Sequence, residues 1–204
     1  MKNLFLTAFL LIFGCLGATA QVCYADFESP GLNFLGLDGV LTAPFANPTP
    51  NAVNSSTNVA KYVKSNMHAY SLILADNGAP FDLSVNNQFK IDILATVATQ
   101  FIFKLEGSGG QFEKTIDIAV ANEWVTYTID FSAQAFNTGL SKVIIFFDPG
   151  VMTSGDTYYF DNVCAGDGKI CHADFEGPGL NFLGLDGVLT SPVLNPTPNF
   201  VNNS

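Results

Sequence analysis

Basic side chains are scarce in this sequence. Of its 204 residues only eight are lysine and none is arginine, and the formal net charge at pH 7 is −10. Nucleic-acid-binding proteins need basic patches or stripes, so the composition argues against that class of function. Anionic membranes and strongly acidic polysaccharides are poor electrostatic partners for the same reason. Neutral glycans remain compatible with the composition.

Residues that could form a catalytic site are also scarce. The only histidines are His68 and His172, and no Ser/His/Asp set, zinc cluster or glycine-rich phosphate loop can be assembled. Pairs of carboxylates hydrolyse glycosides, but no motif surrounds a pairing of Glu106 with Asp117 or Asp148. We therefore predict a non-enzyme. A glycoside hydrolase domain elsewhere in the full-length parent protein is compatible with this prediction.

Only one sustained apolar run is present, and it lies at the N-terminus. Lys2 precedes the apolar residues 4–14, and small residues follow them. This order is typical of a secretory signal peptide, residues 1–20, cleaved before Gln21. A lipoprotein signal cut before Cys15 is the alternative. No other run reaches the roughly 18 residues of a membrane span, so we expect a secreted or cell-surface protein with no membrane insertion.

An internal repeat organises the chain. Residues 171–204 repeat residues 23–56 at a constant offset of 148, and 27 of the 34 aligned positions are identical. An offset of this size is that of a whole domain rather than of a short solenoid repeat. We predict one complete module, residues 21–166, followed by residues 167–204 as a linker and the truncated start of a second module. The chain is then a piece of a longer protein with further modules.

Alternating apolar and polar residues predict β-strands through most of the module. In residues 89–93, 101–106 and 125–131, every second side chain is apolar or aromatic, which would place one face of each strand in a core. Residues 143–147 are apolar throughout, as in a central strand covered on both sides. No long segment has a helical stripe. The fold class is therefore predicted to be all-β, an antiparallel sandwich or barrel.

Several short segments together resemble a known family. In order and spacing they are similar to the jelly-roll, galactose-binding-like carbohydrate-binding modules attached to secreted polysaccharide-degrading enzymes of Bacteroidetes. The segments are residues 26–28, 58–64, 103–106, 123–127, 143–148 and 158–163. The resemblance implies a jelly-roll β-sandwich whose first and last strands lie side by side and share a structural calcium ion. It also implies a ligand-facing aromatic near residues 67–70, where Tyr70 is the candidate.

The resemblance places the calcium ligands on the first and last strands. Glu28 and Asp161 are the predicted ligands, and Asp26 is an additional one because it shares a strand face with Glu28. Carboxylate oxygens are ligands that calcium prefers. The alternative is that these carboxylates are solvated side chains at a strand end.

Two cysteines flank the strands that the resemblance implies to be neighbours, because Cys23 precedes the first strand and Cys164 ends the last. Cleavage of the signal peptide leaves Cys23, Cys164 and Cys171, an odd number for an exported chain. Cys171 is the repeat's counterpart of Cys23, so its own partner would lie in the missing part of the second module. We predict a disulfide between Cys23 and Cys164. Two buried free thiols are the alternative.

Candidate glycan contacts are Tyr70, Lys104, Glu106 and Trp124. Aromatic rings stack on sugar rings, and charged groups orient hydroxyl groups. Lys104 and Glu106 point outward from one strand, although they could equally form a surface ion pair. Strict alternation places Trp124, the only tryptophan, on the outward side of its strand. Packing in the core or at an edge is the alternative for this side chain.

Two functions are compatible with these features. The first is a non-catalytic carbohydrate-binding module of an exported multi-modular protein, with a neutral polysaccharide as its partner. The second is a structural or adhesive repeat of a large cell-surface protein that binds no sugar itself. Tandem copies suit both functions. They make a binding module multivalent, and they make a structural repeat longer.

Overall fold

The computed structural model describes residues 21–152 and 155–166. All of them fall in one unit of the chain, Gln21–Gly168. The predicted signal peptide, linker and second copy, residues 1–20 and 167–204, lie outside the described residues. In the described part of the chain, no helix is both long and apolar enough to cross a membrane.

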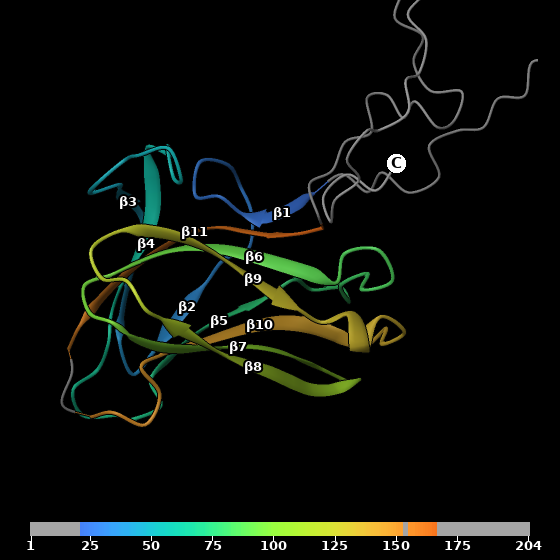
Figure 1. Ribbon diagram of the computed structural model, residues 1–204. Coiled ribbons are helices and arrows are strands. Elements are labelled where there is room, and N and C mark those ends of the chain that lie inside the picture. Colours follow the sequence, from blue (N-terminus) through green and yellow to red (C-terminus); the bar gives the residue numbers. More distant parts are fainter. Residues whose placement is uncertain (1–20, 153–154, 167–204) are drawn as a thin grey trace, which may run out of the picture. The chain divides into compact units, whose positions relative to one another are not determined.

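Antiparallel strands form two sheets, which Figure 1 shows as two layers. In sheet A the order is β3-β4-β11-β6-β9, with β1 paired to β11, and in sheet B it is β2-β5-β10-β7-β8. The strands of sheet A are β1 (Val22–Ala25), β3 (Val40–Ala46), β4 (Asn58–Val63), β6 (Gln88–Ala95), β9 (Trp124–Asp130) and β11 (Thr157–Ala165). Those of sheet B are β2 (Leu35–Leu37), β5 (Leu72–Asp76), β7 (Thr99–Gly107), β8 (Gly110–Ile118) and β10 (Leu140–Phe147). A 3-10 helix, η1 (Ser132–Gln134), follows β9. The predicted all-β, antiparallel sandwich is confirmed.

Apolar side chains at alternating positions fill the space between the sheets. In β6 the inward residues are Phe89, Ile91 and Ile93, each at most 1% exposed, as the alternation predicts. Aromatic rings bridge the two layers. Phe147 of sheet B stacks on Tyr158 of sheet A with ring centroids 4.4 Å apart. Such ring pairs add to the stabilisation that apolar burial itself provides.

The continuous apolar run of β10 has the predicted central position. This strand lies between β5 and β7. Val143, Ile145 and Phe147 are fully buried toward the core, and Ile144 on the opposite side is only 5% exposed. Both sides of the strand are therefore covered at its centre, which explains why no polar residue alternates there.

The last strand, β11, lies inside sheet A rather than at its edge. It pairs with β4 and β6, and its final residues also pair with β1. A bulge separates Asp161 from Cys164, and Asn162 there adopts a φ of 52°, a left-handed conformation that asparagine tolerates. Cys23 and Cys164 are opposite each other in the strand register and are joined by a disulfide. The predicted pairing and the side-by-side first and last strands are confirmed.

Removing the disulfide should destabilise the module without changing its fold. The bond joins residues 141 apart in the sequence. The chain-entropy model gives at most about 5 kcal/mol for so long a loop. We expect the Cys23→Ala/Cys164→Ala variant to lose about 2–5 kcal/mol of unfolding free energy in urea titrations. Cys171→Ala is the matched control and should leave the midpoint in place. An unchanged midpoint in the double variant would contradict the pairing.

Candidate functional site

The outer side of sheet B carries a continuous apolar surface. Strand register places Leu35 beside Leu74 and Leu74 beside Ile144. Residues two positions along each strand lie on the same side. The apolar face of sheet B is thus Leu35, Leu37, Leu72, Leu74, Ile102, Ile144 and Phe146. Leu35 and Leu37 are 56% and 48% exposed. Ile144, at the centre of this face, is only 5% exposed, so its most exposed part is the β2 edge.

A charged pair borders the apolar face of sheet B. Lys104 lies opposite Ile144 in the register of β7 and β10. Its Nζ is 2.8 Å from Glu106 Oε2, and the two side chains are 15% and 37% exposed. A partly exposed pair of this kind contributes less than about 1 kcal/mol to stability. The two predicted residues therefore lie together on the outer side of sheet B, already paired with each other and still accessible.

Tyr70 stands at one end of the apolar face of sheet B. It belongs to the loop that joins β4 to β5, and 64% of its surface is exposed. Its ring meets Phe146 edge-on, with centroids 6.5 Å apart. Three of the four predicted contacts, Tyr70, Lys104 and Glu106, are therefore on the same side of the sandwich.

Trp124 does not belong to this surface. Alternation correctly places its side chain on the outer side of sheet A, but the residue is only 3% exposed. It packs with Val59 and Leu94, and its Nε1 donates a hydrogen bond to Asn47 Oδ1 (3.2 Å). Asn47 belongs to the β3–β4 segment, residues 47–57, which covers this part of the sheet. The expectation that Trp124 contacts a glycan is therefore wrong, because no face of the ring is open.

A buried polar network lies beneath the β3–β4 segment. Asp161 and Asp92 are opposite each other in β11 and β6, and they are 0% and 4% exposed. Asn54 Nδ2 donates to Asp161 Oδ2 (2.8 Å), and Asn162 Nδ2 donates to Asp92 Oδ2 (2.7 Å). Asp161 Oδ1 is buried without a hydrogen-bond partner. Burial raises the pKa of Asp161 above its ordinary value.

The other two predicted calcium ligands, Glu28 and Asp26, follow β1. The Glu28 carboxylate accepts hydrogen bonds from the backbone N (2.7 Å) and side-chain amide (3.1 Å) of Asn58, and these bonds lower its pKa. Asp26 accepts from the backbone N (2.9 Å) and Oγ (3.1 Å) of Ser29, which lowers its pKa in the same way. Residues 54–58 therefore contact Asp161 at one end and Glu28 at the other.

These carboxylates fit a calcium ion only in part. Within residues 21–152 and 155–166, no group of three or more His, Cys, Asp or Glu side chains is placed to hold a metal. The unpartnered oxygen of Asp161 is a free ligand atom. The carboxylates of Glu28 and Asp26 already accept hydrogen bonds. A calcium shell would therefore need backbone and amide oxygens in addition to the three predicted carboxylates.

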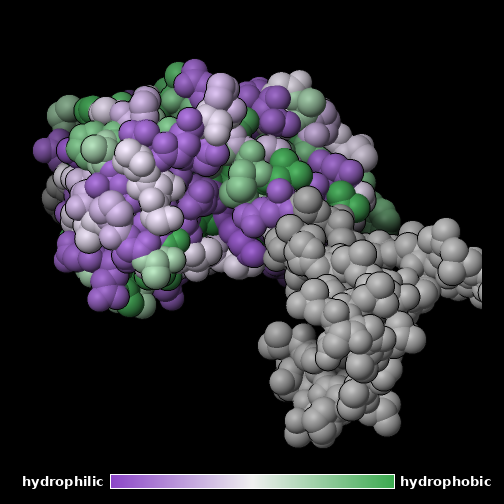
Figure 2. Space-filling view, turned by 90° about the horizontal axis from the view of Figure 1, so that it is seen from above, coloured by the Kyte–Doolittle hydropathy of each residue, from purple (hydrophilic) through white to green (hydrophobic). Residues whose placement is uncertain are grey.

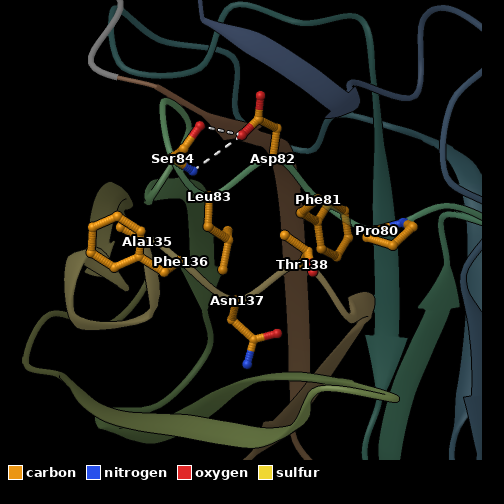
Figure 3. Close-up of a pocket in the computed structure, with 9 residues that line it drawn as sticks. All are labelled: Pro80, Phe81, Asp82, Leu83, Ser84, Ala135, Phe136, Asn137 and Thr138. Atoms are coloured by element: carbon orange, nitrogen blue, oxygen red, sulfur yellow. Dashed lines mark hydrogen bonds between the residues drawn. The ribbon is translucent and has the colours of Figure 1, made fainter.

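An exposed hollow at the opposite end of β5 was not predicted from the sequence. Tyr70 precedes β5, whereas this hollow of about 370 Å³ lies among residues that follow it. Phe136 lines it and is 98% exposed. In Figure 3 the Leu83 side chain lies between the rings of Phe136 and Phe81. Because Phe136 is in an irregular segment between β9 and β10, no periodicity marks it.

The outer side of sheet A is more polar than the apolar face of sheet B. Figure 2 shows the molecule of Figure 1 from above, which is the side where sheet A lies. Hydrophilic residues dominate this view, and hydrophobic residues form small separate patches. On the outer side of sheet B, the predicted contacts Tyr70, Lys104 and Glu106 lie beside apolar side chains.

The burial of Trp124 predicts its spectroscopy. Because it is the only tryptophan, the fluorescence of the folded chain should be blue-shifted and resist quenching by iodide, in contrast to the unfolded chain. Trp124→Phe should lower the unfolding free energy by about 1 kcal/mol or more, since Asn47 Oδ1 loses one of its two donors and the smaller ring leaves a void. Emission and quenching like those of the unfolded chain would contradict this burial.

The comparisons with known proteins show a similarity of fold and no close similarity of sequence. No family model and no curated protein matches the sequence. A mutant of a family 29 carbohydrate-binding module superposes with a TM-score of 0.51 at 16% identity, over 74% of this chain and 94% of that chain. A second family 29 mutant gives 0.51 at 15% identity, over 72% and 90%. An exo-β-agarase gives 0.57 at 17% identity, over 70% of this chain and 24% of that chain. The chain thus has the fold of these carbohydrate-binding modules, as the resemblance implied.

Proposed function

We propose that this protein is a non-catalytic carbohydrate-binding module that holds an exported, multi-modular protein on a neutral polysaccharide. The observation that carries the proposal is the position of Tyr70. Its exposed ring lies at the end of the apolar face of sheet B, on the same side as the Lys104–Glu106 pair. The fold shared with structures that are named as carbohydrate-binding modules supports this function.

The chemistry of this surface suits a sugar chain. Pyranose rings have apolar C–H faces and polar edges of hydroxyl groups, so they need a ring or aliphatic platform and a few oriented polar groups. Tyr70 supplies the ring, and the leucines of β2 and β5 supply the aliphatic platform. Lys104 Nζ can donate to a hydroxyl oxygen, and the Glu106 carboxylate can accept from a hydroxyl. Their ion pair holds both groups in place, which reduces the entropy lost on binding.

The charges around this surface favour a neutral ligand. Each lysine there has an acidic neighbour in the strand register. Glu113 of β8 lies opposite Lys104, and Asp76 of β5 lies opposite Lys142. The net charge of the chain is −10. An anionic polysaccharide would therefore meet no excess of positive charge, whereas hydroxyl groups meet both donors and acceptors.

One observation favours the second candidate function, a structural or adhesive repeat. The most exposed side chains of the apolar face, Leu35 and Leu37, are aliphatic and lie on β2, an edge strand of sheet B. An exposed apolar edge strand suits contact with another protein, because its free backbone groups can pair with a further strand.

Glycan affinity should depend on Tyr70. Tyr70→Ala removes the stacking ring and should weaken binding by roughly 5- to 30-fold, equivalent to about 1–2 kcal/mol. Affinity electrophoresis in gels containing neutral β-glucan, galactan or xylan would find the ligand. Calorimetry with its oligosaccharides would then measure the affinity.

Phe136→Ala is the matched control for Tyr70→Ala. It removes an aromatic ring that is even more exposed, but beyond the opposite end of β5. We expect it to leave the affinity unchanged. If Phe136→Ala abolished binding and Tyr70→Ala did not, the site would be the hollow rather than the apolar face of sheet B. If no neutral polysaccharide bound even at millimolar concentration, the structural repeat would be the better function.

We also propose that Asp161, Glu28 and Asp26 hold a structural calcium ion. The buried, unpartnered Oδ1 of Asp161 supports this, because a cation would offset the cost of burying that charge. Residues 54–58 contact Asp161 through Asn54 and Glu28 through Asn58, so the backbone and amide oxygens of this segment are the candidates to complete a shell.

Calcium should raise the melting temperature of the module. At a hundredfold excess over its dissociation constant, the ion would add about 2.7 kcal/mol to the unfolding free energy. Thermal melting with calcium and then with excess chelator measures this. Asp161→Asn keeps the side-chain shape and should abolish the difference, whereas Asp117→Asn, on the exposed surface of β8, should preserve it. Equal melting temperatures with calcium and with chelator in the unmutated protein would refute the site.

A further inference from the structure

Lys64 is a buried lysine without an ion-pair partner. It follows the last residue of β4 and continues the inward series of Ala60 and Tyr62, with only 2% of its surface exposed. Within the described residues, no carboxylate forms an ion pair with it. Burial lowers the pKa of its ammonium group, although Asp148 and Asp156 act in the opposite direction. A buried cation of this kind costs stability, so its presence needs an explanation other than the stability of the fold.

Both side-chain hydrogen bonds of Lys64 end in one loop, whereas its backbone N donates to Asp156 O (3.0 Å). Its Nζ donates to the carbonyl oxygen of Ala69 (3.1 Å) and to Ser71 Oγ (3.4 Å), both in the 65–71 loop that begins directly after it. The Ala69 carbonyl also accepts a hydrogen bond from Gly150 N (2.9 Å), in the segment after β10. This carbonyl therefore ties the loop to two separate parts of the module. The next residue in the chain is Tyr70.

The ring of Tyr70 is located by contacts that depend on this anchor. It meets Phe146 edge-on. A Cβ atom at Gly150 would lie 3.8 Å from the Tyr70 hydroxyl, so the hydroxyl is above Gly150. The rest of the loop offers little packing, since Met67 at its tip is 73% exposed. The orientation of Tyr70 therefore depends on polar contacts made by its neighbours in the chain.

We propose that Lys64 is a positioning residue of the glycan site, whose buried ammonium group holds the Ala69 carbonyl and thereby presents Tyr70 beside Phe146 before the ligand arrives. This inference rests on the proposed function, because Tyr70 is taken to be the stacking ring. A ring that is already ordered loses less conformational entropy when a sugar binds. Burying Lys64 then lowers the free energy of unfolding because the binding site requires this residue. Functional sites lower the stability of other proteins in the same way.

The proposal predicts that stability and affinity change in opposite directions in Lys64→Met. Methionine fills the same volume without a charge, so the melting temperature should stay the same or rise. Ala69 O keeps its hydrogen bond from Gly150, and Ser71 Oγ loses only the longer contact, 3.4 Å, with Lys64 Nζ. The loop loses its anchor, so the affinity for the neutral oligosaccharide identified with the unmutated protein should fall by about three- to tenfold. Calorimetry at one temperature and thermal melting measure the two quantities.

Two further variants test whether the effect is specific to the Lys64 ammonium group. Lys114→Met makes the same substitution at an exposed position of β8, whose neighbours in register lie away from the apolar face, and it should change neither quantity. Ser71→Ala keeps the shorter hydrogen bond, from Lys64 Nζ to Ala69 O, and should weaken binding less than Lys64→Met. This variant also keeps the proposal testable if Lys64→Met fails to fold. A lower melting temperature with unchanged affinity in Lys64→Met would overturn the proposal, because Lys64 would then serve the fold alone.

A measurement without ligand separates this proposal from the proposed function. Nuclear Overhauser contacts between the rings of Tyr70 and Phe146 should be present in the unmutated protein and lost in Lys64→Met. Contacts that persist in the variant would overturn the positioning role, whatever the glycan affinity. If the unmutated protein bound no neutral glycan, the proposed function would fail. Loss of the ring contacts would still show that Lys64 orders Tyr70.

Discussion

The insertion of β11 between β4 and β6 is the constraint on which the rest of the module depends. The last strand of the described module becomes a central strand of sheet A, so this sheet is complete only when the two ends of the module meet. The Cys23–Cys164 disulfide joins those ends covalently. The register of β11 places Tyr158 and Phe160 in the core. It also turns Asp161 to the outer side, where the β3–β4 segment covers it.

The two outer sides of the sandwich differ in what covers them. On sheet A the β3–β4 segment buries Trp124 and the Asp92–Asp161 network. The aromatic and acidic groups there therefore contact other residues of the module rather than solvent. On sheet B the apolar face is only partly covered: Ile144 at its centre is 5% exposed, whereas Leu35, Leu37 and Tyr70 are exposed. Ligand binding therefore fits sheet B, although both sheets are built from similar strands. The covering segment, rather than the strand sequence, determines which side is available.

Strand periodicity predicted the fold and the facing of side chains, but not their exposure. The alternation in β6 and the apolar run of β10 are found as expected, because sheet geometry requires a period of two. The same alternation placed Trp124 on the correct side, yet it could not show that residues 47–57 fold over that side. Phe136 lies in an irregular segment without any period. The burial of Lys64 follows from the inward series of Ala60 and Tyr62, but its role depends on a loop that only the structure places against it.

The central claim is that the outer side of sheet B, with Tyr70 at its end, receives a neutral glycan. The most direct test is a titration of the isotope-labelled module, residues 21–168, with a neutral oligosaccharide, followed by amide chemical shifts in nuclear magnetic resonance spectra. The shifts should change in the 65–71 loop and along β5, β10 and β7, near Lys104 and Ile144. Changes confined to the β3–β4 segment and Trp124, or to the hollow beside Phe136, would contradict it.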